Sequence, residues 1–248
     1  MFRRPIIAAL ALAALGVGTA YAQVGGPCID FSDHQSFVNY CNTHGKITKG
    51  TETFEDGIIP PAGKSCFPGP MGPFPTPPWF PTGLAVTNMI IQDNIEPGPS
   101  PIPLHPSGDG CALYVIGTGF IGAKSNKVGE DLFLAGIPAS VDIIFTENDK
   151  TGVGFNLSRF VGFPTGGWIV TVYNTLNIPI GVYMVPAPAG NEPEKDFFGV
   201  WCSPGIGRIN IFDMAGLAPD ALDNIESWVD IITPTKRATW GQLKLSYR

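Results

Sequence analysis

The chain has 248 residues, of which 44% are hydrophobic and 15% charged, and its formal net charge is −6 at pH 7. This acidic balance argues against nucleic acid or an anionic membrane surface as a partner, because both attract basic proteins. The 31 glycines and 25 prolines would indicate low complexity if they were evenly spread. The prolines gather instead in residues 60–81 and 97–106, while residues 111–230 alternate apolar runs with turn residues. We therefore expect a globular β protein with irregular loops.

The first 22 residues have the pattern of an export signal. Arg3 and Arg4 precede an apolar run, and Ala20-Tyr21-Ala22 fits the small-x-small pattern of a signal-peptidase site. We predict cleavage after Ala22 and a mature protein that is secreted or periplasmic. Loss of the two arginines leaves 13 basic against 21 acidic residues, a net charge of −8. No later stretch approaches the roughly 18 apolar residues of a membrane-spanning helix, so no span is expected in the mature chain.

All five cysteines follow the predicted cleavage point, where an oxidising compartment favours disulfides. Cys28 and Cys41 lie thirteen residues apart around a helix-like segment, and we predict that they pair, which would contribute about 3 kcal/mol. A bond between Cys66 and Cys111 would hold the Pro-rich loop on the domain. Cys202 is then left as a buried thiol. Spacing by itself does not decide the pairing beyond these expectations.

In chain order, residues 23–50 form a polar, Cys-bounded N-terminal segment with a short helix over 32–42. The first strand is predicted at 51–54, before the Pro-rich excursion. Further strands are expected at 84–92, 112–116, 131–133, 141–147, 153–160, 168–173, 180–185, 198–202 and 208–212. Two pairs of these strands read as hairpins: 168–173 with 180–185, and 198–202 with 208–212 around Pro204-Gly205.

The last strand is expected to begin at Asp223 and Asn224. Short strands at this spacing predict an all-β fold, an antiparallel β-sandwich of jelly-roll type over residues 51–230. A C-terminal extension, 231–248, would follow it.

Two acidic motifs stand at opposite ends of the predicted sandwich sequence. Glu55 and Asp56 follow the first strand, and Asp223 and Asn224 begin the last one. If the first and last strands pair, Glu55 and Asp223 come together, and their charges repel unless a cation or hydrogen bonds hold them. We therefore predict a structural Ca²⁺ site made by Glu55, Asp56, Asp223 and Asn224, with loop carbonyls around Asn126. The alternative is that these side chains cap strand ends or accept backbone N–H bonds.

The Pro-rich excursion also carries aromatic residues. Trp79 and Phe80 are candidates for a sugar- or protein-binding surface if they are exposed in an extended, polyproline-like loop. The alternative is that the aromatic side chains of this loop pack it onto the sandwich, because burial of aromatic area orders a loop that lacks backbone hydrogen bonds.

Three sequence motifs carry a family resemblance. FFGVWCSPGIGRINIF (residues 197–212) followed by ALDNI (221–225), together with TFEDG (53–57), resembles the jelly-roll domain of bacterial exported proteins, including those with exosortase (PEP-CTERM) sorting tails. The resemblance covers residues 51–228 and implies a sandwich similar to carbohydrate-binding modules, with no established activity. The Pro-Glu-Pro motif, membrane helix and basic tail of the tailed members are not found, so exosortase anchoring is not implied.

Catalytic motifs are sparse. The three histidines, His34, His44 and His105, stand in no triad-like or metal-binding spacing, and no serine lies in a G-x-S-x-G elbow. A glycosidase needs two carboxylates across a cleft, for which the candidates are Glu55, Asp56, Asp142, Glu147, Asp213 and Asp223. We assign no catalytic residue and expect an exported, non-catalytic module that binds glycan or a surface protein. The alternatives are a secreted hydrolase acting on polysaccharide and a structural envelope protein.

Overall fold

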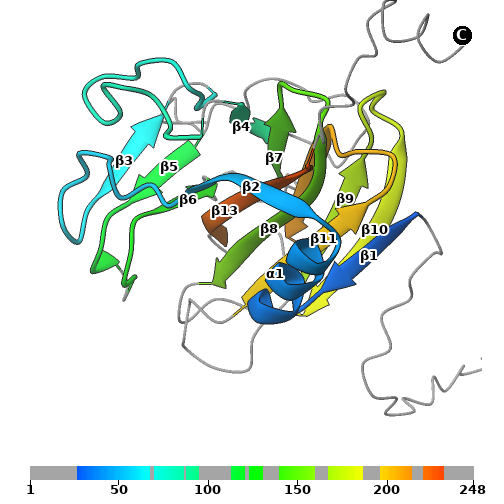
Figure 1. The fold of residues 1–248 in the computed structure, drawn as a ribbon. Coiled ribbons are helices and arrows are strands. Elements are labelled where there is room, and N and C mark those ends of the chain that lie inside the picture. Colours follow the sequence, from blue (N-terminus) through cyan, green and yellow to red (C-terminus); the bar gives the residue numbers. More distant parts are fainter. Residues whose placement is uncertain are drawn as a thin grey trace, which may run out of the picture.

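A computed structural model of the chain describes residues 27–67, 70–86, 88–94, 113–120, 123–130, 140–159, 167–186, 196–213 and 220–231. In these residues the protein is a sandwich of two antiparallel sheets with one short helix (Figure 1). This architecture confirms the predicted all-β sandwich. The predicted signal segment, strand 131–133 and all but the first residue of the C-terminal extension lie outside the described residues.

The eight-stranded sheet has the order β1-β11-β8-β13-β6-β5-β3, with β2 pairing beside β13. Its strands are β1 (Cys28–Phe31), β2 (Lys46–Glu52), β3 (Lys64–Phe67), β5 (Leu113–Ile116), β6 (Lys127–Glu130), β8 (Lys150–Arg159), β11 (Asp196–Cys202) and β13 (Asp220–Asp230). The five-stranded sheet has the order β10-β9-β12-β7-β4. Its strands are β4 (Met89–Asn94), β7 (Ser140–Phe145), β9 (Gly167–Tyr173), β10 (Pro179–Pro186) and β12 (Arg208–Asp213).

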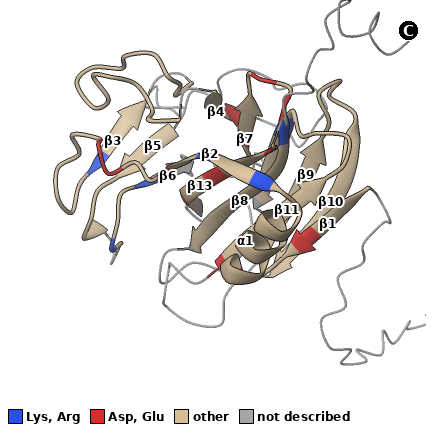
Figure 2. Cartoon of the chain, in the orientation of Figure 1, with Lys and Arg blue, Asp and Glu red and all other residues tan. Residues whose placement is uncertain are grey.

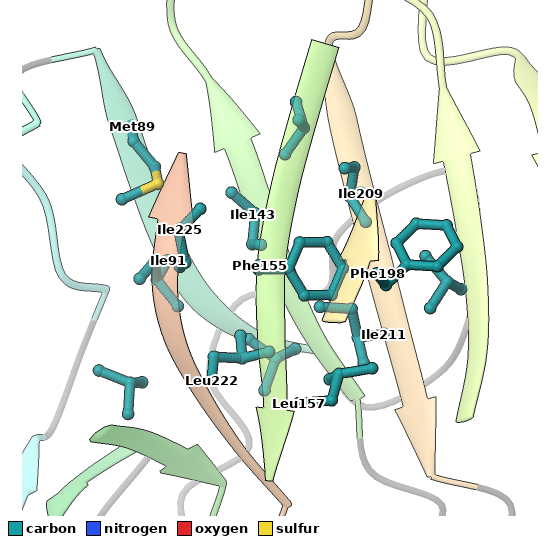
Figure 3. Packing of buried hydrophobic residues seen from close by; sticks show 14 of the residues in the cluster. Met89, Ile91, Ile143, Phe155, Leu157, Phe198, Ile209, Ile211, Leu222 and Ile225 are labelled. Atoms are coloured by element: carbon teal, nitrogen blue, oxygen red, sulfur yellow. The ribbon is translucent and has the colours of Figure 1, made fainter. Parts of the chain in front are cut away.

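The core lies between the two sheets and follows from the two-residue period of the strands. On β7, Ile143 points into the core, while its neighbour Asp142 points to the other face of the sheet. Figure 3 shows inward side chains from both sheets in contact: Met89, Ile91, Ile143, Ile209 and Ile211 face Phe155, Leu157, Phe198, Leu222 and Ile225. This alternation is the reason that the polar residues of the five-stranded sheet share one outer face.

Helix α1 (His34–Thr43) covers the outer face of the eight-stranded sheet (Figure 1). Its N-terminus is capped by Asp33, whose Oδ1 accepts a hydrogen bond from the Ser36 N–H at 2.8 Å. Phe37 and Cys41, one turn apart, are the buried residues of the helix and pack with residues of β11 and β13. The predicted helix at 32–42 is confirmed.

The predicted hairpin of 198–202 with 208–212 is wrong. Strand β11 pairs with β1 and β8 in one sheet, and β12 pairs with β7 and β9 in the other. The connection between them therefore crosses from sheet to sheet, as the β7–β8 connection does. Strands β11 and β12 each turn an apolar face to the core. Their residue pattern is the same whether the two strands pair in one sheet or lie in opposite sheets, so the pattern does not distinguish the two arrangements. The predicted hairpin of β9 and β10 is confirmed.

The N-terminal segment is part of the sandwich and not a separate piece. Strand β1 pairs with β11, and β2 begins five residues before the predicted first strand and pairs with β13. The Pro-rich excursion contains one strand, β3, which lies at the end of the sheet and whose four residues contain no proline. These strands are short and polar in part, so the alternation of apolar residues did not reveal them.

The predicted Cys28–Cys41 disulfide is wrong, and Cys28 is bonded to Cys202. Cys28 and Cys202 face each other across β1 and β11 on the core side of the sheet, whereas Cys41 lies under α1 on the opposite side. Cys41 is a buried free thiol, and burial raises its pKa to about 12. Cys66 is disulfide-bonded, but its predicted partner Cys111 lies outside the described residues, so that pairing stays a prediction.

In the part of the chain that the structure describes, there is no helix long and apolar enough to cross a membrane.

Candidate functional site

Three connections meet at one end of the sandwich: residues 146–149 between β7 and β8, 174–178 between β9 and β10, and 203–207 between β11 and β12. Backbone hydrogen bonds join the third connection to its neighbours, from Gly207 N to Tyr173 O at 2.9 Å and from Ile206 N to Lys150 O at 2.6 Å. A Cβ atom at Gly207 would stand 2.6 Å from the Asn174 carbonyl oxygen. Glycine at this position is therefore required for the close packing of two of these connections.

A first hollow of about 280 Å³ opens between these connections. Asparagine side chains and an arginine dominate its polar lining, and two apolar residues of β7 complete it. The lining residues are Ile144, Phe145, Asn148, Asn174, Thr175, Asn177, Gly207 and Arg208. Amide and guanidinium groups offer hydrogen-bond donors in fixed planes, and the amides also accept.

Arg208 is held in place by three neighbours. Its Nη1 donates to Asp142 Oδ1 at 2.8 Å, its Nε donates to Asn177 Oδ1 at 2.9 Å, and the guanidinium lies 3.6 Å from the centre of the Tyr173 ring. Asp142 is fully buried, and burial raises the pKa of its carboxyl although Asn210 and Arg208 oppose the shift. The guanidinium is thus oriented before any ligand arrives.

The 174–178 connection is ordered by its own side chains. Asn174 Oδ1 accepts hydrogen bonds from the Leu176 and Ile178 N–H groups at 2.9 and 3.0 Å. Asn177 adopts φ 59°, a left-handed conformation that asparagine tolerates better than most residues. By contrast, the exposed Asn148 side chain makes no hydrogen bond within the part of the chain that the structure describes. Its amide is therefore the polar group of the first hollow that is most accessible to a ligand.

A second hollow of about 300 Å³ lies beside the first, on the side of β8 and β13. It shares Asn148 with the first hollow and adds carboxylates and hydroxyls. Its lining residues are Asn148, Asp149, Thr151, Ser203, Pro204, Gly205, Val229 and Asp230.

Lysines pair with both carboxylates of the second hollow from outside its lining. Asp149 pairs with Lys150 and with Lys49, whose Nζ is 3.6 Å away, and Asp230 pairs with Lys46. Figure 2 shows this arrangement as red in the β7–β8 connection beside blue at the start of β8. Burial opposes ionisation of Asp149, but the hydrogen bond from Lys150 and the charges of both lysines outweigh it, so the pKa of Asp149 is lowered.

Strand β2 pairs with β13, as predicted, and Glu55 and Asp223 both contact residues 125–127. Asp223 is buried, and its Oδ2 accepts hydrogen bonds from Ser125 Oγ at 2.6 Å and Lys127 Nζ at 2.9 Å. Glu55 Oε1 accepts from the Asn126 N–H at 2.6 Å. Both carboxylates thus contact consecutive residues just before and at the start of β6.

These contacts correspond to the alternative in which hydrogen bonds hold the acidic residues, and the buried Lys127 supplies a positive charge beside Asp223. Asp56 and Asn224 are both exposed. In the described ranges, no group of three or more His, Cys, Asp or Glu side chains lies close enough to share a metal ion. Calcium binding by these residues stays a prediction.

The aromatic residues of the Pro-rich excursion pack on the sandwich. Phe80 is 1% exposed and belongs to the core, and Trp79 is partly buried with its ring centre 5.0 Å from that of Phe67. This burial favours the interpretation in which the aromatic side chains fix the loop, and it leaves Phe80 out of reach of a ligand.

The remaining catalytic candidates are dispersed. His34 Nε2 lies 3.0 Å from Glu226 Oε1, and His44 stacks on Tyr40 with ring centres 3.9 Å apart. Asp142 is buried and accepts a hydrogen bond from Arg208 Nη1. His105 and the side chain of Asp213 lie outside what the structure describes.

Sequence reasoning missed the residues of the first hollow. Its signals were the Asn-x-x-Asn spacing of Asn174 and Asn177 and an arginine, Arg208, at the start of an apolar strand. Each of these has an ordinary explanation in a turn or at a strand end, so only their convergence in space marks a site.

No family model and no curated protein matches the chain. A search of solved structures finds a family 32 carbohydrate-binding module (CBM) from C. perfringens NanJ, solved in complex with galactose. It is 10% identical, the match covers 56% of this chain and 93% of that chain, and the TM-score is 0.26. By its own geometry, the described part of the chain is an antiparallel β-sandwich with hollows between the loops at one end, lined by both polar and apolar residues.

Proposed function

We propose that the protein is an exported, non-catalytic β-sandwich that binds glycan through the first hollow. The observation that carries this proposal is the convergence of Asn148, Asn174, Asn177 and Arg208 around a space of about 280 Å³. At about 280 Å³ the hollow lies just under the roughly 300–1,000 Å³ of small-molecule pockets, so it has room for at most one sugar ring and not for a large cofactor. The hydroxyl groups of a sugar both donate and accept, which matches amide side chains. The Cys28–Cys202 disulfide fits an oxidising compartment outside the cytoplasm.

The distribution of shifted pKa values favours binding over the hydrolase alternative. A glycosidase needs one carboxyl with a raised pKa to protonate the leaving group, beside a second that stays ionised. Burial raises the pKa of Glu52, Asp142 and Glu226, and none of the three lines either hollow. Asp149, which does line the second hollow, has a lowered pKa and is ionised at neutral pH.

Titration of the protein with a panel of neutral and charged oligosaccharides tests the proposal by heat release and by chemical-shift changes. Asn148→Ala is expected to weaken binding about 5- to 10-fold, because one hydrogen bond is worth about 1 kcal/mol. The exposed Asn148 makes no internal hydrogen bond within the described residues, so unfolding of the variant should match that of wild type. Asn42→Ala, an equally exposed asparagine on α1, is the control and should bind as wild type does.

Two results would contradict the proposal. One is that no member of the panel binds to the wild-type protein. The other is that a panel member is hydrolysed and that hydrolysis stops when Asp149 or Asp230 is replaced by asparagine.

A further inference from the structure

The two hollows are neighbours and not separate features of the surface. Asn148 lines both of them, and the 203–207 connection contributes Gly207 to the first hollow and Ser203, Pro204 and Gly205 to the second. The connection is tightly fixed, since Gly205 has φ 78° and the Ile206 N–H bonds to Lys150 O. The spacing between the hollows is therefore set by the fold and does not depend on a mobile side chain.

We propose that the second hollow is a second sugar subsite, which takes a unit that donates hydroxyl or amino hydrogens and disfavours a unit that carries a carboxylate. This inference rests on the proposed function of the first hollow. The ligand is then an oligosaccharide of at least two units, and the exposed Asn148 stands where the two units join.

The chemical preference follows from the groups that line the second hollow. Asp149 and Asp230 face it, while their partners Lys46, Lys49 and Lys150 are absent from its lining. Carboxylates accept hydrogen bonds and donate none when ionised. The exposed Ser203 hydroxyl can donate or accept, whereas Thr151 is buried and its hydroxyl donates to Asp230 Oδ1 at 3.5 Å. A neutral or amino sugar satisfies this set, whereas a uronate would place a third carboxylate among acceptors.

The first and second hollows differ in the charged residues of their linings. The first carries three amides, and its one charged lining residue, Arg208, is 3% exposed and paired with Asp142, so its accessible lining is uncharged. The second carries no basic side chain in its lining. Only the second hollow is therefore expected to disfavour an anionic sugar unit.

The test uses neutral gluco-, galacto- and manno-oligosaccharides of one to four units, the matching glucosamine oligomers and the matching uronates. In the series that binds, we expect the disaccharide to bind at least tenfold more tightly than the monosaccharide, with little further gain beyond two or three units. The uronate disaccharide should bind at least tenfold more weakly than its neutral counterpart, and the loss should shrink as salt screens the carboxylates.

Ser203→Phe places a ring in the second hollow at an exposed turn position, so it blocks this subsite without touching the core. It should remove the gain from the second unit and leave monosaccharide binding unchanged. Ser32→Phe, an exposed serine before α1, is the matched control and should bind as wild type does.

The outcomes separate this inference from the proposed function. If no oligosaccharide of the panel binds, both are wrong. If monosaccharides bind but the disaccharides bind no more tightly, or Ser203→Phe leaves the chain-length dependence intact, only the second subsite is wrong. Tighter binding of the uronate would refute the stated preference.

Discussion

At the scale of single residues, Lys127 and Asp223 form a buried ion pair at the edge of the core. Both side chains are almost fully buried, and the ammonium lies 2.9 Å from the carboxylate. Removal of one partner leaves the other charge buried without compensation. Lys127→Met is therefore expected to lower the free energy of unfolding by about 3–5 kcal/mol, measured by urea denaturation.

The matched comparison is Lys49→Met, whose lysine lies in an exposed ion pair with Asp149 and whose side chain is 39% exposed. It should cost no more than about 1 kcal/mol. Similar losses in the two variants would show that the buried pair contributes no more than a surface pair.

Calcium binding at Glu55 and Asp223 is testable in the same region. If an ion binds there, chelation should lower the melting temperature, because a ligand at a hundredfold excess over its Kd adds about 2.7 kcal/mol to stability. Asp223→Ala should then abolish the response to chelator. An unchanged melting curve with chelator and with added Ca²⁺ would leave Lys127 as the cation beside Asp223.

At the scale of elements, His34 of α1 contacts Glu226 of β13, a carboxylate whose pKa is raised. Burial raises the pKa of Glu226, although His34 opposes the shift, and the buried Cys41 thiol faces the same carboxylate. A carboxyl with a raised folded-state pKa contributes stability below its unfolded pKa of about 4.3 and loses it as pH rises through the folded pKa. The wild-type protein should therefore lose stability from this group as pH rises above about 4.3, until the raised folded-state pKa has been passed.

Glu226→Gln removes that titration. The difference in unfolding free energy, variant minus wild type, should become more favourable to the variant from pH 4 to pH 7, as measured by urea denaturation at each pH. Glu147→Gln is the control, because the hydrogen bond from Lys150 lowers the pKa of the exposed Glu147. A carboxyl with a lowered pKa loses its stabilising effect only as pH falls below its unfolded pKa of about 4.3, so the difference for Glu147→Gln should stay constant as pH rises above that value. A difference for Glu226→Gln that is constant with pH would show that its titration is not linked to folding.

At the scale of the whole molecule, the Cys28–Cys202 disulfide spans 174 residues and links β1, the first strand, to β11. The chain-entropy model gives about 5 kcal/mol for a loop of this length. The double variant Cys28→Ala, Cys202→Ala should therefore melt about 10–20 °C lower than wild type in a protein of this size.

Cys41→Ala is the control, since it removes a buried thiol that is not bonded. It should cost far less than the double variant. Non-reducing peptide mapping should find Cys28 linked to Cys202, and Cys41 should react with a thiol reagent only after unfolding. A Cys28–Cys41 peptide in that map would overturn the assignment.

The pattern of residues along the chain was enough to predict the class of fold and most of the strands. On β10 buried and exposed residues alternate, and the apolar runs of β7, β9 and β12, which are mostly buried on both faces, are bounded by turn residues, so all four segments are predicted as strands. The same pattern also predicts α1, since Asp33 can cap the helix and Phe37 and Cys41 lie on one face. These features depend on interactions between residues close in the chain.

By contrast, the sheet that each strand joins, the pairing of the cysteines and the place where a ligand can bind depend on contacts between residues far apart in the chain. A two-residue period fixes the buried face of a strand but not its neighbours, so β11 and β12 read as a hairpin although they lie in different sheets. Cys28 and Cys202 meet because β1 and β11 pair across 174 residues. Asn148 and Arg208 line one hollow because two sheet-crossing connections end side by side, and no local spacing encodes that proximity.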